Sequence, residues 1–112
     1  MLRPLLLILL LIPQLLLASQ EVKLEARPRA TNEASNIRIR VEPDTRNRQL
    51  VLEWYLAEGL ENRKFWELKG DQSAIYYTYL IKFTESGDWT VRARVERHDD
   101  SRVINATTVL VR

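Results

Sequence analysis

The sequence predicts an all-β fold of seven strands in two packed sheets, and three observations support this prediction. Apolar and polar residues alternate with a period of two over several short segments, as in strands with one buried face. Turn residues separate these segments at intervals of roughly 8 to 12 positions. No segment of useful length has the 3.6-residue periodicity of an amphipathic helix.

The clearest strand begins at Trp89, from which apolar residues alternate with polar ones as far as Val95. The preceding residues 85–88 predict a turn, in which Gly87 is free to take a positive φ. An aromatic residue after a glycine turn, followed by inward-facing apolar residues, is typical of a core strand. We therefore expect residues 89–97 to lie at the centre of the fold.

The other strands follow the same reasoning in chain order. Residues 21–26 alternate and precede Pro28, which cannot donate to a sheet and so ends or bends an edge strand. Residues 37–41 alternate between aliphatic side chains and two arginines, Arg38 and Arg40, which we expect on a solvent-facing side. Residues 50–56 place Trp54 among leucines on one face.

Three more segments complete the set. Residues 64–68 form a short strand, and residues 57–62 before it are expected to form a loop or a helical turn. Residues 74–83 place Tyr77 and Tyr79 on one face and Tyr76 on the other. Residues 98–101 predict a hairpin turn, after which residues 103–111 return antiparallel to the central strand.

The first 19 residues have the organisation of a secretory signal peptide. Arg3 supplies a positive charge, residues 5–12 are an unbroken run of Leu and Ile, and Ala18 and Ser19 are small residues suited to cleavage. The alternative is a retained membrane tether, although the apolar stretch falls short of the ~20 residues that a spanning helix needs. We expect a signal peptide over residues 1–19, a domain over residues 20–112, and a secreted or periplasmic location.

Composition excludes several classes of function. Without Arg3 the domain has 16 basic and 15 acidic residues, a net charge of +1 (16 − 15), which does not suit a nucleic-acid-binding protein. The absence of cysteine excludes disulfides, thiolate metal sites and thiol catalysis. It also favours a bacterial or archaeal envelope over a metazoan secretory pathway.

No catalytic constellation is apparent, so the sequence predicts no enzyme and no cofactor. The one histidine, His98, adjoins Asp99 and Asp100 in the predicted hairpin turn, where neighbouring side chains face solvent rather than a shared metal. The acidic residues show no paired spacing, and no phosphate-binding glycine loop occurs. Asn105 begins a glycosylation sequon, which matters only in a eukaryotic pathway.

Several of these residues resemble the core of an immunoglobulin-like sandwich. Trp54 is similar to the buried tryptophan of that family's third strand, and Ile39 and Val91 stand where its two cysteines lie. The run of residues 83–95 resembles PKD-type modules of bacteria and archaea even more closely, although the Asp-Gly that usually follows their core tryptophan is absent after Trp54. This resemblance implies a cysteine-free, immunoglobulin-like β-sandwich and no particular ligand.

Aromatic residues are in surplus on the segments at 50–56, 64–68 and 74–83. One interpretation is that the surplus caps the rim of the core. The other is an exposed patch that binds a partner. Its candidate residues are Tyr55, Trp66, Tyr76 and Tyr79.

We therefore expect an exported, non-catalytic module that binds an envelope or extracellular protein, or takes part in an envelope assembly. The alternatives are a carbohydrate-binding module, with Trp66 and the tyrosines stacking on sugar rings, and a structural subunit of a surface polymer. Contact with a membrane is expected only through a retained N-terminal segment.

Overall fold

A computed structural model describes residues 21–56 and 62–112, in which seven strands form two sheets. The prediction of an all-β fold with two sheets is confirmed, and the described residues contain no α-helix. The strands are β1 (Val22–Arg27), β2 (Ala34–Val41), β3 (Asn47–Leu56), β4 (Asn62–Glu67), β5 (Tyr76–Lys82), β6 (Gly87–Arg97) and β7 (Arg102–Val111). A single 3₁₀ turn, η1 (Gly70–Gln72), precedes β5. No described helix is long and apolar enough to cross a membrane.

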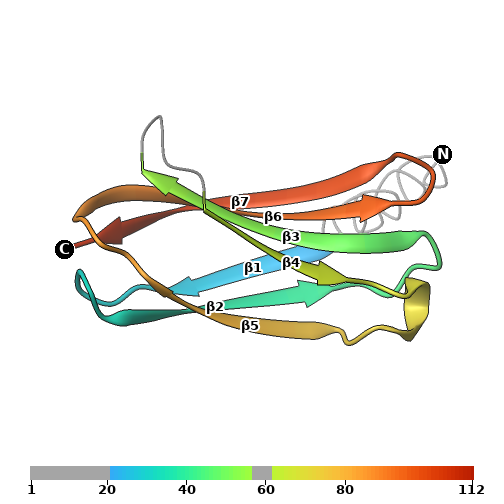
Figure 1. Cartoon of the computed structure of the whole chain (residues 1–112), viewed down its shortest axis with the longest axis horizontal. Coiled ribbons are helices and arrows are strands. Elements are labelled where there is room, and N and C mark those ends of the chain that lie inside the picture. The colour runs from blue at the N-terminus through green and yellow to red at the C-terminus, as the bar shows by residue number, and fades with distance from the viewer. Residues whose placement is uncertain (1–20, 57–61) are drawn as a thin grey trace, which may run out of the picture.

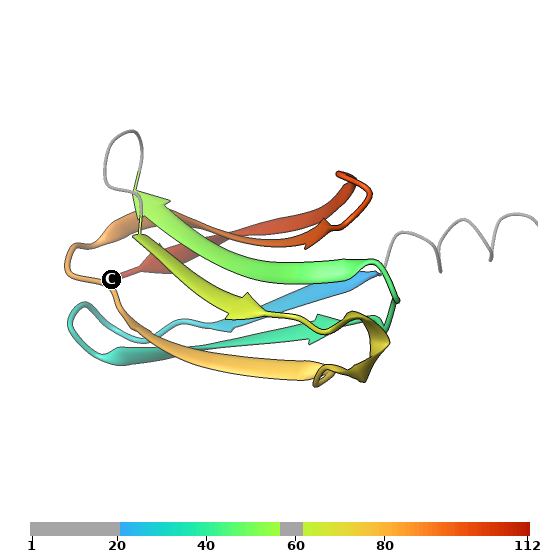
Figure 2. The same ribbon diagram turned by 45° about the vertical axis from the view of Figure 1, so that its right-hand side comes forward.

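The two sheets are antiparallel and lie face to face as two layers (Figures 1 and 2). One has three strands in the order β1-β2-β5, and the other has four in the order β4-β3-β6-β7. On one side of the sandwich β1 lies against β7, where the side-chain amide of Asn105 donates to the carbonyl of Val22 at 3.0 Å. The opposite side is bounded by β4 and β5, the other two edge strands.

The core lies between the layers and is built from one face of every strand except β4. It contains Val22, Ile37, Ile39, Val41, Leu50, Leu52, Leu68, Ile81, Phe83, Trp89, Val91, Ala93, Val95, Val109 and Val111. Trp89 packs on Phe83 with ring centroids 4.9 Å apart, and its indole N–H donates to the Glu85 carbonyl at 2.9 Å. The hydrogen bond satisfies the one polar atom of an otherwise apolar side chain, which is what allows it to be buried.

Most strand predictions agree with the structure, including the outward Tyr76 and the inward Tyr77 and Tyr79 of β5. Gly87 has a φ of +140°, as expected for the turn before β6, and a Cβ there would lie 3.0 Å from Leu56. Trp54 differs from expectation. It is only half-buried, because it lies at the β4–β5 side of the sandwich and contacts Tyr79.

The boundaries of the fourth strand also differ, since β4 begins at Asn62 and ends before Leu68. The predicted signal peptide over residues 1–19 lies outside the described residues. So do residues 57–61 of the loop or turn predicted over residues 57–62, whereas Asn62 is the first residue of β4.

Candidate functional site

The four aromatic residues predicted to bind a partner lie in three different places. Tyr76 is 60% exposed on the outer face of the three-stranded sheet. Trp66 and Tyr79 are half-buried between β4 and β5, with ring centroids 6.0 Å apart. Tyr55 is half-buried on the outer face of the four-stranded sheet, on the same side as its neighbour Thr90. Of the four, the structure brings Trp66 and Tyr79 together.

The outer face of the three-stranded sheet, which we call the basic face, is formed by alternate residues of β1, β2 and β5. Strand pairing arranges them in three rows: Lys23-Arg40-Tyr76, Glu25-Arg38-Thr78 and Arg27-Asn36-Leu80. These three rows carry four cations and one carboxylate, a net charge of +3 (4 − 1), and Lys82 opposite Ala34 extends the same face. This is a strong local excess in a chain whose overall formal charge is +2.

In the described ranges of the chain, two of the four cations in these rows lack a carboxylate partner, whereas Arg40 pairs with Glu42 at 3.4 Å. Lys23 stands directly opposite Arg40, and like charges in this position destabilise a sheet. Glu25 stands opposite Arg38 but bonds the Nε of Arg27 instead, at 3.1 Å. Among the described residues, no carboxylate lies within 4.0 Å of Lys23 or Arg38. Both cations are therefore available to an anion from solution.

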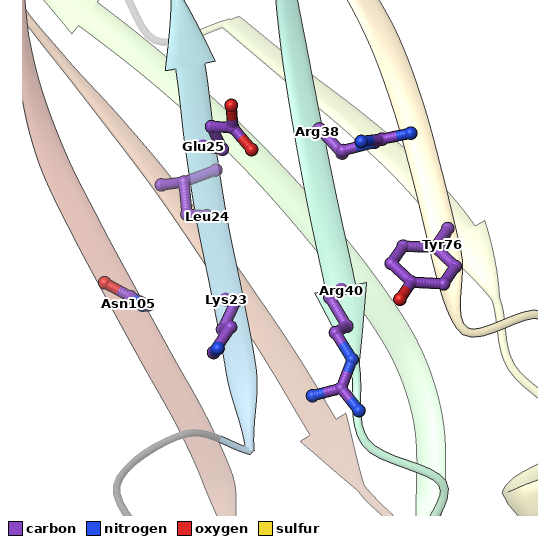
Figure 3. Close-up of a pocket in the computed structure, with 7 residues that line it drawn as sticks. All are labelled: Lys23, Leu24, Glu25, Arg38, Arg40, Tyr76 and Asn105. Atoms are coloured by element: carbon purple, nitrogen blue, oxygen red, sulfur yellow. The ribbon is translucent and has the colours of Figure 1, made fainter.

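A shallow depression of about 290 Å³ lies over this part of the basic face (Figure 3). Lys23, Arg40 and Tyr76 line it from three adjacent strands, and the Arg38 guanidinium lies 5.8 Å from the centroid of the Tyr76 ring. Asn105 of β7 lines its far side. The volume is close to the lower limit of ~300 Å³ for small-molecule sites. A cavity of this size with several cations and one exposed ring suits a small anionic ligand.

The alternation of Arg38 and Arg40 along their strand predicts ordinary solvent-facing residues and does not by itself indicate this site. The sequence does contain a signal for this site. Both arginines alternate along a strand, and that strand is the next one in the chain after the strand that carries Lys23. Pairing β1 with β2 antiparallel brings the three cations together, and the register of that pairing is what the sequence did not reveal.

The outer face of the four-stranded sheet, which we call the glutamate face, also carries arginines, and three of them contact one carboxylate. Glu53 on β3 is fully buried although it points outward. Its Oε1 accepts from Arg92 at 3.0 Å and lies 3.1 Å from Arg94, and Arg63 lies 3.4 Å from its Oε2. The Arg63 contact lacks hydrogen-bond geometry, so Oε2 has a charged neighbour but no hydrogen bond. Three guanidinium groups thus cover one carboxylate.

A third group of charges lies where the β2–β3 loop meets the β6–β7 turn. Arg46 donates to Asp44 at 2.8 Å and to Asp99 at 3.1 Å. The hydrogen bond from Arg46 holds the pKa of Asp44 well below its usual range. Hydrogen bonds from the hydroxyl and backbone N–H of Ser101, assisted by Arg46, lower the pKa of Asp99 to about 2. His98 next to Asp99 is exposed, and its backbone N–H donates to the Arg46 carbonyl.

Comparison of the whole fold with solved structures identifies similar proteins. The superoxide reductase (neelaredoxin) from Ignicoccus hospitalis matches with a TM-score of 0.67 and 14% sequence identity, over 83% of this chain and 81% of that chain. A single-residue variant of the same enzyme matches with a TM-score of 0.66 and 14% identity, over 81% and 79% of the two chains. No family model matches the sequence, and no curated protein does.

These neighbours correct the family assignment and the predicted function. The assignment to PKD-type modules is wrong, because the two matching structures reported above are superoxide reductases. The prediction of a non-catalytic envelope module, with its carbohydrate-binding and polymer alternatives, is contradicted by the same finding. The prediction that the chain is not an enzyme is contradicted as well, because both matching structures with this fold are redox enzymes. At 14% identity the likeness establishes the fold, and activity must be argued from residues.

The residues of this chain do not fit the metal centre that such a neighbour implies. Superoxide reductases are metalloenzymes, and redox metals in proteins are held chiefly by imidazole, thiolate and carboxylate ligands. This sequence has one histidine and no cysteine. Within residues 21–56 and 62–112, no three His, Cys, Asp or Glu side chains gather closely enough to hold an ion. No electron transfer through a metal is therefore assigned to this chain.

Proposed function

We propose that the protein binds a small oxyanion, of the phosphate or carboxylate class, on the basic face. The observation that carries this proposal is the row in which Lys23 faces Arg40, beside an Arg38 that has no carboxylate within 4.0 Å among the described residues. Like charges placed directly opposite each other lower the stability of a sheet, and the Arg40–Glu42 ion pair leaves Lys23 and Arg38 without a carboxylate partner in the described part of the chain. A bound anion relieves that repulsion, so the repulsion becomes part of the free energy of binding.

The chemistry of the three cations favours an oxyanion over a halide. A guanidinium group presents a planar fork of N–H donors that matches two oxygens of a phosphate or carboxylate, and an ammonium group adds a compact charge. Arg38 is oriented by its contact with the exposed Tyr76 ring. The same ring offers an apolar wall to the organic part of a ligand such as a phosphate ester.

The substrate named for the structural neighbours, superoxide, is also a small anion. Attraction of an anion to a sandwich surface is therefore chemistry that the two proteins could share. Its reduction would need an electron donor, for which the described residues offer no ligand set. The proposal for this chain is accordingly limited to recognition of the anion.

Titration with inorganic phosphate tests the proposal, followed by calorimetry and by backbone amide NMR. We expect saturable binding in the millimolar range or tighter, with shifts concentrated on β1, β2 and the start of β5. Arg38→Gln should weaken binding about tenfold or more, because hydrogen bonds to charged groups contribute about 1.5–3 kcal/mol.

Arg102→Gln provides the matched control. Arg102 is exposed on β7 and pairs with Glu96 of β6 in the strand register, so it belongs to the four-stranded sheet and not to the basic face. This variant should bind phosphate as the parent protein does. Equal losses in the two variants would mean that net charge, rather than the basic face, attracts the anion, and unchanged binding in Arg38→Gln would remove the site altogether.

We also propose that the protein is exported and acts outside the cytoplasm, with residues 1–19 removed. Arg3, the apolar run at residues 5–12 and the small residues Ala18 and Ser19 support this proposal. Fractionation and intact-mass measurement of the expressed protein test it. An uncleaved chain recovered from the cytoplasm would contradict it.

A further inference from the structure

We propose a second ligand site, separate from the depression beside Lys23, Arg40 and Tyr76, at the end of the sandwich between β4 and β5, and we infer that it takes a flat aromatic anion. A depression of about 280 Å³ lies there. It is lined by Trp54, Asn62, Tyr79, Leu80, Ile81, Lys82, Thr84 and Trp89. These residues come from β3, β4, β5 and β6 of both sheets and from the β5–β6 loop, so the site exists only when the sandwich is closed.

Aromatic rings form the inner wall of this site. Trp54 and Tyr79 lie with ring centroids 5.6 Å apart and planes tilted by 42°, and the buried Trp89 lines the same depression. Rings arranged in this way can contact a planar ligand by offset or edge-to-face packing. Within the part of the chain that the structure describes, neither the Trp54 indole N–H nor the Tyr79 hydroxyl has a hydrogen-bond partner. Polar contacts to a ligand are therefore available at both rings.

The charge of the site selects an anion. Lys82 lines it and has no carboxylate within 4.0 Å among the described residues, and the lining contains no Asp or Glu. A second cation lies nearby, since the Lys64 ammonium is 5.9 Å from the Tyr79 ring centroid and 5.7 Å from that of Trp66. A ring compound with a carboxylate or sulfonate satisfies both the aromatic wall and the lysine.

The three tryptophans allow a direct test with the whole protein and 2-naphthoate as the probe. Trp54 and Trp89 line the site, whereas Trp66 does not. In proton–nitrogen NMR spectra, with indole signals assigned from single Trp→Phe variants, we expect the Trp54 and Trp89 signals to shift saturably and the Trp66 signal to shift much less. The neutral analogue 2-naphthalenemethanol should bind more weakly.

Lys82→Gln should lower the affinity for 2-naphthoate about twofold to fivefold, as for a partly exposed ion pair, and leave the neutral analogue unaffected. Lys69→Gln is the control, because Lys69 is exposed next to η1, at the opposite end of the sandwich (Figure 1). Lys23→Gln should leave the naphthoate titration of the Trp54 and Trp89 signals unchanged, which separates this site from the depression beside Lys23, Arg40 and Tyr76. Equal shifts at all three indoles, no saturation, or no effect of Lys82→Gln would overturn the proposal.

Discussion

The two outer faces of the sandwich both carry several cations but differ in how many of these cations contact a carboxylate. On the glutamate face, Arg63, Arg92 and Arg94 gather around Glu53, which they cover completely. On the basic face, Glu25 bonds Arg27 of its own strand and Arg40 pairs with Glu42 at 3.4 Å. Lys23 and Arg38 have no carboxylate within 4.0 Å among the described residues. The number of cations is therefore a poor guide to their role. The position of the carboxylate decides whether they stabilise the fold or remain open to a ligand.

Glu53→Gln should produce the largest loss of stability, because it removes the negative charge that three arginines of the glutamate face contact. The amide cannot balance three guanidinium groups, and removing one partner of a buried ion pair costs about 3 kcal/mol or more. We expect a loss of about 3 kcal/mol in the free energy of unfolding, measured by urea denaturation.

Glu67→Gln is the matched control for this experiment, since Glu67 lies on an outward position of β4 and is exposed. Its effect should stay within about 0.5 kcal/mol. If the two variants were equally stable, Glu53 would not be what holds the arginines of this face, and the contrast between the two faces would be lost.

Acidification should have a smaller effect, through the exposed but compensated charges at the β6–β7 end. The pKa of Asp99 in the folded protein is lowered to about 2, below its unfolded value near 3.8. The stabilisation is therefore complete above the unfolded pKa and is lost as the pH falls from about 4 through about 2. We expect Tm to fall over that range, and to fall less in Asp99→Asn. Identical acid profiles for the two proteins would show that other carboxylates govern the transition.

Lys23→Gln should have the smallest effect on stability, and the sign of that effect tests whether Lys23 is repelled by Arg40 on the basic face. Removing the charge opposite Arg40 relieves repulsion across the β1–β2 pair, so we expect stability to rise by about 0.2–0.5 kcal/mol at low ionic strength. The gain should shrink in 0.5 M salt because exposed charges are screened. A loss of stability would show that Lys23 is already compensated in the free protein.

Local pattern was sufficient to predict the fold class and most strands. Ile37, Ile39 and Val41 alternate with exposed residues, and all three are buried. The turn glycine, Gly87, follows from the need for a positive φ ahead of a core strand. These features depend on residues next to one another in the chain, which is the information that a single sequence contains.

The sites depend on register between strands and could not be predicted in this way. Val51 and Glu53 occupy outward positions of β3, yet both are fully buried by side chains from neighbouring strands. Trp66 and Tyr79 were predicted to share one exposed patch with Tyr55 and Tyr76, but the structure places them in contact with each other between the two sheets. The family assignment failed for a related reason. A tryptophan in a strand and a glycine turn are shared by many sandwiches and do not distinguish one family from another.

The bond from Asn105 to the Val22 carbonyl has a consequence for production of the protein in eukaryotic cells. The side-chain nitrogen that an oligosaccharide would occupy is the atom that joins β7 to β1, and the residue is half-buried. A sugar could therefore be attached only before the chain has folded, while β7 has not yet packed against β1. The fraction of molecules that carry a glycan would then report how quickly the first and last strands meet during secretion.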